Sequence, residues 1–307
     1  ALLNTCSMDA DGVAATSPVE VRERWVMPYV DLQNNGTLVL SPEGKLVGYA
    51  LLASVSDSYT RLRATGRVHP AYRKRGIGTY LMQFMELRAR EMLPLAAPQN
   101  RVALTAGCSA NDGDAREFIL ASGFSPLRTF WLMRIDFDSP PPQPHWPVGV
   151  SVRQMVGGQD EQAVWDADQD IFRDHWGYMP MPFEDFVTHI NSLHYDPTLS
   201  FLALADGQIA GFSLNLPGTT EDPAMGFIED LGVRRAWRRQ GIALALLYHS
   251  FGAFYRAGKT SAALSVDSNS LTGATRLYER AGMHIMRQFD LYEKELRPGV
   301  EIAVRSL

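Results

Sequence analysis

Short apolar runs alternate along this chain with longer segments whose apolar residues recur every three or four positions. The runs predict strands at 37–40, 62–68, 150–153, 200–205, 227–233, 262–266 and 285–293. The clearest helix follows residue 241, because Leu244, Leu247, Phe251 and Phe254 fall on one face at helical spacing. Turn signals at 42–44 and 206–207 join neighbouring strands into hairpins. The pattern therefore predicts an α/β chain with a mixed sheet.

Three landmarks of this pattern occur twice in the same order. Residues 44–49 (GKLVGY) return as 207–212 (GQIAGF), 73–78 (RKRGIG) as 238–243 (RRQGIA), and 122–124 (SGF) as 281–283 (AGM). Between the copies, residues 139–147 contain five prolines, which exclude regular helix. We therefore expect a first domain at 1–138, a linker at 139–147 and a second domain at 148–307.

The first copy has no counterpart of the opening strand predicted at 150–153. That counterpart would fall upstream of Ala1, so we expect that the fold of the first domain begins before this residue.

Composition excludes several classes of function. The net charge of −5 argues against a partner nucleic acid, and the longest apolar stretch, 242–248, is too short to cross a membrane. Two cysteines and dispersed histidines form neither a disulfide framework nor a metal site, so we expect no metal and a cytoplasmic setting. The oligomeric state stays open.

The repeated basic, glycine-containing loop lies between a strand and a helix. The first N–H groups of a helix have no intrahelical partner and the helix dipole favours an anion there, while arginines add donors for phosphate oxygens. A strand–turn–helix junction with surface arginines is the alternative, and it would not need to occur twice. The predicted phosphate-binding residues are Arg73, Lys74, Arg75, Gly76, Ile77 and Gly78, and Arg238, Arg239, Gln240, Gly241, Ile242 and Ala243.

Both loops, read from Val68 to Gly78 and from Val233 to Ala243, resemble the acetyl-CoA-binding motif of the GNAT superfamily of N-acyltransferases. A second signature of that family resembles the run from Asn269 through Ala274, Leu277 and Tyr278 to Gly282 and Met283. The resemblance covers the whole chain as a tandem pair. It implies two GNAT-type domains, each with a splayed sheet, and acetyl-CoA as co-substrate with Asn269 among its contacts. The resemblance does not fix the acceptor, for which a primary amine of a small molecule is our leading expectation.

Acyl transfer to an amine needs a base, an oxyanion donor and a proton donor for the departing thiolate. Glu229 and Asp230 stand on the strand before the second loop, where the family places its base, and the backbone of Leu231, Gly232 and Val233 follows them. The resemblance assigns the acid to Tyr278. Pairing of Glu229 with an arginine, and packing of Tyr278, are the alternative interpretations.

The first copy has no carboxylate on the matching strand, 61–68, and Ile119 at the position of Tyr278. We therefore expect the second domain to catalyse, whereas the first either holds CoA or only keeps the fold. Acetylation of a peptide or protein amine, and a silent CoA-binding regulatory module, are the alternative functions.

Acceptor recognition rests on the helix predicted at 160–175. Val164, Asp168, Ile171 and His175 share one face, and Asp168, His175 and Trp176 are the expected acceptor contacts. Asp166, Asp170 and Asp174 form an acidic stripe, which we expect to be a solvated surface.

Overall fold

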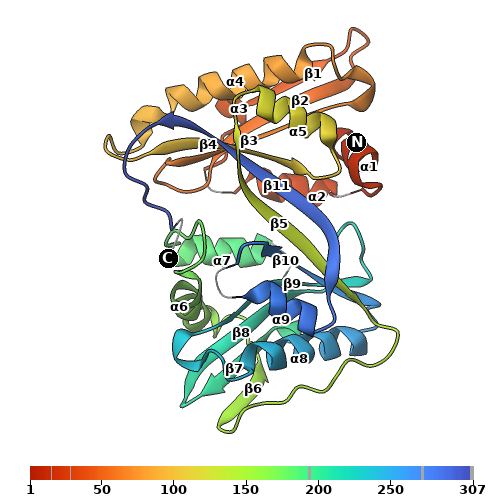
Figure 1. Cartoon of the computed structure of the whole chain (residues 1–307), viewed down its shortest axis with the longest axis vertical. Helices are drawn as coiled ribbons and strands as arrows, with labels where there is room; N and C mark the ends of the chain where they lie inside the picture. The colour runs from red at the N-terminus through yellow and green to blue at the C-terminus, as the bar shows by residue number, and fades with distance from the viewer. Residues whose placement is uncertain (15, 28, 193–194, 271–272, 305–307) are drawn as a thin grey trace. The chain divides into compact units, whose positions relative to one another are not determined.

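The computed structural model describes all residues except 15, 28, 193–194, 271–272 and 305–307, and its strands and helices alternate as the sequence predicts (Figure 1). The chain forms two compact units: residues 1–130 with 288–302, and residues 131–287 with 303–307. Neither unit is one continuous stretch of sequence, and each is described separately below.

The first unit begins with helices and then forms its strands. Its elements are α1 (Leu2–Asp11), α2 (Pro18–Trp25), α3 (Leu32–Asn35), β1 (Gly36–Leu40), β2 (Leu46–Ser54), β3 (Arg61–Val68), η1 (Pro70–Tyr72), α4 (Ile77–Glu91), η2 (Leu93–Leu95), β4 (Val102–Ser109), α5 (Gly113–Ala121) and the start of β5 (Ser125–Asp136). The described residues before β1 contain helices and no strand.

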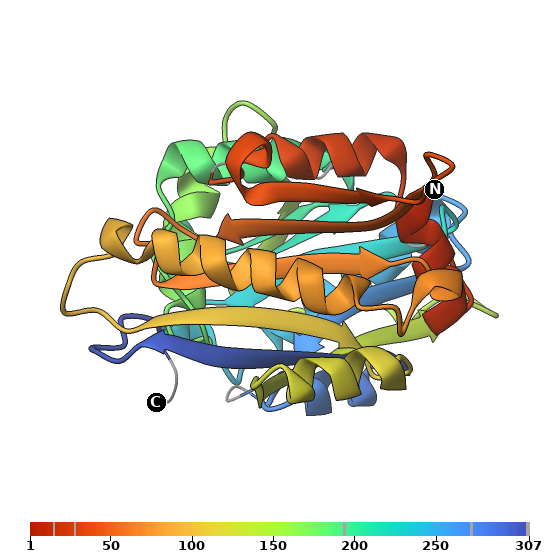
Figure 2. The same cartoon turned by 90° about the horizontal axis from the view of Figure 1, so that it is seen from above.

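In the first unit the strand order is β1-β2-β3-β4-β11. Strands β2 and β3 pair antiparallel without a register shift, whereas parallel β3 and β4 pair only from Arg61–Ala103 to Arg63–Thr105. Helix α4 lies along β2 and β3 (Figure 2). The core beneath it contains Leu52, Leu62 and Leu104, all fully buried.

The second unit repeats this plan with its opening strand present. Its elements are β6 (Val150–Gln154), α6 (Glu161–Phe172), α7 (Phe183–Ser192), η3 (Pro197–Leu199), β7 (Phe201–Ala205), β8 (Gln208–Leu216), β9 (Met225–Val233), η4 (Arg235–Trp237), α8 (Ile242–Arg256), β10 (Ser261–Asp267), α9 (Ala274–Arg280) and the start of β11 (His284–Arg297).

In the second unit the strand order is β5-β10-β9-β8-β7-β6. Helix α8 confirms the predicted apolar face, since Leu247, Phe251 and Phe254 are fully buried. Close packing against this helix explains a glycine on β9: a Cβ at Gly226 would lie 2.4 Å from the Phe254 ring.

The closing strand of each sequence copy contributes to the other unit. Strand β5 follows the last helix of the first copy, but its residues from Trp131 onward belong to the second unit, where β5 neighbours β10. Strand β11 ends the second copy, and its residues 289–297 pair antiparallel with β4 of the first unit. Met133 of β5 is fully buried in the same cluster as Leu264 and Tyr278. The core of the second unit therefore includes side chains from before the proline-rich segment.

Met133→Ala should destabilise the second unit although the residue belongs to the first copy in sequence. Truncating a fully buried methionine costs about 2–5 kcal/mol, so the urea midpoint should fall clearly. Met8→Ala, at a position 52% exposed, is the matched control and should change stability by less than about 0.5 kcal/mol. Equal midpoints for the two variants would contradict the exchange of strands.

Candidate active site

The site begins where β9 parts from its parallel neighbour β10. The two strands pair from Met225–Ser261 to Ile228–Leu264, and no pairing continues beyond. On the other side of β9 the register with β8 shifts at the same place: Asp230 faces Leu214 and Ile228 faces Asn215, so Glu229 is an extra residue. Such a bulge re-aims side chains. Glu229 and Asp230 therefore lie at the opening between two separating strands.

Strand β9 leads into the predicted phosphate-binding loop. Arg239 and Gly241 adopt the left-handed conformation, with φ of 64° and 92°, and Gly241 caps α8 without any side-chain hydrogen bond. A Cβ at Gly241 would meet nothing within 4 Å. Open space therefore lies beside Gly241 at the start of α8, and a left-handed turn before the N-terminus of a helix suits an anion. The first unit repeats this geometry at Lys74 (φ 59°) and Gly76 (φ 82°).

Two arginines of the second loop, Arg235 and Arg238, bind other residues of the second unit, whereas the Arg239 side chain lies in solvent. Arg238 donates to the carbonyls of Val233 and Ile171, each at 3.0 Å, and to the Asp174 carboxylate at 3.4 Å. Arg235 also donates to Asp174. Arg239 is exposed. The side chain of Arg238 therefore holds the loop against α6, and Arg239 has its charge in solvent.

Asp174 corrects the expectation of a solvated acidic stripe. Its side chain is only 6% exposed, because the two arginines of the loop bind it just after α6 ends. A buried carboxylate is costly unless charged or hydrogen-bonding partners compensate for the water it has lost. The same ion pair occurs in the first unit, where Arg73 binds Asp9 at 2.9 Å. Both residues lie 165 positions before their counterparts Arg238 and Asp174, so the pair is part of the repeat.

The loop of the first unit carries additional carboxylate partners. Arg73 reaches Asp112 at 3.4 Å and Lys74 reaches Asp114 at 3.1 Å, while Arg75 lies over the Tyr72 ring at 5.0 Å. All three basic side chains of that loop thus have partners within the unit.

Three carboxyl groups and one phenol of the second unit share one electrostatic environment. Burial raises the pKa of Asp230 to about 6, and burial together with the Asp230 charge raises the pKa of Glu229 to about 7. Asp168 on α6 has its pKa raised to about 7 by the same two causes. Burial, with Asp230 again contributing, raises the pKa of Tyr278 to about 12. The structure thus brings together the predicted catalytic residues and Asp168 around Asp230.

The remaining predicted residues surround this cluster more loosely. A Cβ at Gly232 would lie 2.3 Å from Ile171, so glycine here lets α6 pack on β9. The His175 ring packs edge-to-face against Phe172, and burial and Arg238 lower the pKa of His175. Asn269 is exposed in the turn after β10, where its backbone N–H donates to Asp267 at 2.9 Å. Leu231, Ala243 and Trp176 are half-buried, Val233 and Ile242 buried, and Gln240 exposed.

Sequence reasoning missed Gln169, which lies next to Asp168, and its contact with Tyr178. The Gln169 side-chain amide donates to Asp168 at 3.1 Å, and Tyr178 donates to the Gln169 oxygen at 2.8 Å. Their contact depends on how the segment after α6 folds back, which no sequence spacing indicates.

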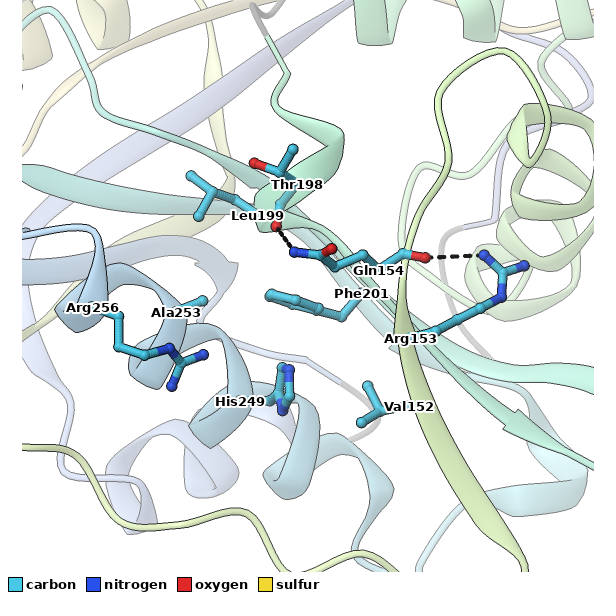
Figure 3. Close-up of a pocket in the computed structure, with 9 residues that line it drawn as sticks. All are labelled: Val152, Arg153, Gln154, Thr198, Leu199, Phe201, His249, Ala253 and Arg256. Atoms are coloured by element: carbon cyan, nitrogen blue, oxygen red, sulfur yellow. Dashed lines mark hydrogen bonds between the residues drawn. The ribbon is translucent and has the colours of Figure 1, made fainter.

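A separate cavity of about 370 Å³ opens in the second unit between β6, η3, β7 and α8 (Figure 3). Its lining includes Arg153, Phe201, His249 and Arg256. It contains none of the predicted catalytic or phosphate-binding residues, so it is not the site described above.

Two absences hold for the described part of the chain. No group of three or more His, Cys, Asp or Glu side chains there is placed to hold a metal ion. None of the described helices has the length and apolar character needed to span a membrane.

Comparison with known proteins agrees with the geometry. Residues 162–283 match the Acetyltransferase (GNAT) family and residues 33–126 match an Acetyltransferase (GNAT) domain. A mycothiol acetyltransferase from Thermomonospora curvata is 30% identical over 248 residues, covering 80% of this chain and 78% of that protein. The chain belongs to the GNAT family of acetyltransferases.

Solved structures extend the GNAT match over both copies. A GCN5-related N-acetyltransferase from Sphaerobacter thermophilus has a TM-score of 0.82 and 37% identity, covering 98% of this chain and 92% of that one. A tandem GNAT protein from the clavulanic acid biosynthesis pathway has a TM-score of 0.69 at 18% identity, covering 97% and 94%. A second mycothiol acetyltransferase, from an Arthrobacter species, is 28% identical over 77% of this chain and 71% of its own. The chain is thus a tandem GNAT, an acetyl-CoA-dependent N-acetyltransferase with a mixed α/β fold.

The two GNAT copies differ at the predicted catalytic positions. The offset that relates Asp9 to Asp174 relates Leu3 to Asp168, Ala64 to Glu229 and Thr65 to Asp230. Strands β2 and β3 also lack the register shift found between β8 and β9. The titratable cluster and the bulge therefore occur together, in the second unit.

Glu229→Gln should stabilise the protein increasingly as pH rises. The pKa of Glu229 is raised by folding from 4.5 to about 7, so the ionised form is disfavoured in the folded state, and stability is lost as pH rises through this interval. Relative to the native chain, the variant should gain about 1–3 kcal/mol between pH 5 and pH 8. Urea unfolding across that range measures it.

Glu279→Gln, at an exposed position of α9, is the control and should show no such pH dependence. A gain for Glu229→Gln that is constant with pH would contradict the burial of an ionisable Glu229.

Proposed function

We propose that the chain transfers the acetyl group of acetyl-CoA to a primary amine of a small molecule, by direct attack in a ternary complex at the second unit. The observation that carries this proposal is the coincidence, at Glu229, of the parting strands, the bulge and the carboxyl cluster. Acceptor, thioester and base can meet only where the sheet is open and a proton acceptor lies at the opening.

The loop before α8 suits the pyrophosphate of CoA. Its donors are the uncapped N–H groups of Ile242 and Ala243, with the Arg239 guanidinium beside them. Strands β9 and β10 part next to this loop, so backbone N–H groups of β9 are available to the pantetheine arm and to the oxyanion. In the first unit, by contrast, Lys74 stands at the position of Arg239 and already pairs with Asp114.

The carboxyl cluster is suited to accept the proton of the amine. An amine is protonated near neutral pH and must lose a proton before its nitrogen attacks the thioester carbon. A carboxyl group whose pKa is about 7, as for Glu229, is a stronger base than an ordinary glutamate and is still half ionised at neutral pH. We assign the base to Glu229 with Asp230. The two titrate together, so apparent values belong to the pair.

Tyr278 serves the departing thiolate. When the carbon–sulfur bond breaks, negative charge develops on sulfur, whose thiol has a pKa of about 8.5. Because the pKa of Tyr278 is raised to about 12, its hydroxyl keeps its proton throughout the neutral range. The phenol therefore donates a hydrogen bond to the sulfur as the charge forms.

The names of the relatives support a small-molecule acceptor, since several are mycothiol acetyltransferases. Incubating the protein with acetyl-CoA and glucosamine, cysteine, putrescine or a short peptide, and following CoA release, separates the candidate functions. Turnover with a small amine supports the proposal. Turnover with the peptide alone favours peptide acetylation, and tight CoA binding without any turnover favours a regulatory module.

Gly241→Val should weaken CoA binding by about 10- to 100-fold, because its side chain fills the space in which phosphate meets the helix N–H groups, at about 1.5–3 kcal/mol. Calorimetric titration with CoA measures this. Gly76→Val is a close control, since both glycines have positive φ and open space around the Cβ position. It should leave the affinity within about twofold. Loss of binding in Gly76→Val alone would place the site in the first unit.

Tyr278→Phe and Glu229→Gln should each lower kcat by about 10²- to 10⁴-fold and leave CoA affinity nearly unchanged. The loss in Glu229→Gln should be largest near neutral pH and shrink as the solution approaches the pKa of the amine, because the acceptor then deprotonates unaided. Native kcat/KM should rise as pH passes through about 6–7, where the carboxyl groups ionise. Steady-state pH profiles test these expectations, and two silent variants would remove the assignment.

A further inference from the structure

Gln169 connects the carboxyl cluster to the segment that follows α6. Its amide nitrogen donates to Asp168 Oδ2 at 3.1 Å, and its amide oxygen accepts from the Tyr178 hydroxyl at 2.8 Å and from the Met181 backbone N–H at 3.1 Å. Trp165, one turn earlier on α6, donates its ring N–H to the Met181 carbonyl at 2.8 Å. Two residues on one face of α6 thus hold both backbone groups of Met181.

These contacts fix the orientation of the Gln169 amide. Two donors converge on one end of the side chain, so that end must be the oxygen, and the NH₂ group must face Asp168. The Tyr178 hydroxyl must be the donor in its hydrogen bond to Gln169, since an amide oxygen can only accept. The chain of bonds therefore has one direction, from Tyr178 through Gln169 to the Asp168 carboxylate.

We propose that Gln169 is a positioning residue of the acetyl-transfer site, which fixes the Asp168 carboxylate beside Asp230 and anchors the 177–181 segment to α6. The proposal rests on the proposed function for what the site does, but the hydrogen bonds of Gln169 do not depend on any catalytic role. Asp168 lies between a like charge and a donor: without Gln169, burial and the Asp230 charge would raise its pKa unopposed. The charged and titratable groups that face Asp168 are Asp230 from β9 and Tyr178 from the following segment.

Two substitutions separate the two roles of Gln169. Gln169→Glu keeps an oxygen for Tyr178 and Met181 but has no N–H for Asp168. Gln169→Leu removes both interactions. Gln162→Leu is the matched control, because Gln162 also lies on α6 and donates to an aspartate, Asp166, but at an exposed position.

In the full chain, the titration of Asp168 is followed by the NMR chemical shift of its carboxyl carbon over pH 4 to 9. Asp168→Asn assigns this resonance. The exchange rate of the Met181 amide hydrogen is measured on the same samples. The titration midpoint should rise by about one pH unit or more in Gln169→Leu, since a hydrogen bond to a charged acceptor is lost. It should rise further in Gln169→Glu, which adds a like charge beside Asp168. Exchange at Met181 should accelerate about 10-fold or more in Gln169→Leu but stay within about threefold in Gln169→Glu. Gln162→Leu should change neither quantity.

Acetylation of glucosamine supplies a third readout. If it is turned over, KM for glucosamine should rise about 5- to 10-fold in Gln169→Glu with kcat within about threefold, as expected when about 1–1.4 kcal/mol of acceptor binding is lost. A native midpoint in Gln169→Leu overturns the positioning role, whatever the activity. If the midpoint is raised but the protein acetylates no amine, the positioning role stands and the proposed function is refuted. If Gln169→Leu fails to fold, Gln169→Ala takes its place, because it also removes both interactions without adding a charge.

Discussion

The separation of β9 from β10 after the Ile228–Leu264 pair is the constraint on which the site depends. Parallel strands normally continue to exchange hydrogen bonds, and leaving backbone groups unpaired is costly unless another partner is present. The strands part next to the loop of Arg239 and Gly241, so a ligand held by that loop reaches the unpaired backbone directly. Because β9 also carries an extra residue at Glu229, the carboxyl groups meet the same opening. One irregularity of the sheet thus places unpaired backbone groups and two carboxyl groups together.

The two copies show which part of this arrangement belongs to the fold and which to the chemistry. Both parallel pairs stop early, both loops use a left-handed basic residue and a left-handed glycine, and both anchor an arginine on an aspartate at the end of the preceding helix. The bulge and the carboxyl groups occur only in the second copy, where the first has Leu3, Ala64 and Thr65. The first copy therefore retains the scaffold. Strand exchange gives a physical reason, because Met133 of that copy fills the core beneath Tyr278.

Much of the fold could be predicted from sequence because it follows from local pattern. The strands, the apolar face of α8 and the repeat are visible as periodicity and recurring motifs. The resemblance to the GNAT motifs pointed to Glu229, Asp230 and Tyr278, whose catalytic roles stay predictions. The exchange of β5 and β11 could not be predicted, because a closing strand has the same pattern whichever sheet it joins. Asp174 was misinterpreted for a related reason: i,i+4 spacing identifies a helix face but not whether arginines from 61 residues later cover it. Gln169 gave no signal, since its partners depend on the path of a loop.

The same burial that makes the site reactive also makes it costly. Each carboxyl group of the cluster would be more stable protonated, as the raised pKa values of Asp168, Glu229 and Asp230 show. No arginine or lysine is paired with any of these three carboxyl groups in the ion pairs found among the described residues, although arginines of the adjacent loop pair with Asp174. A cation beside Glu229 would lower its pKa. Arg235 and Arg238 pair with Asp174 instead, so the pKa of Glu229 stays raised. Under the proposed function, an acceptor amine would therefore meet a carboxyl group that can take up a proton near neutral pH.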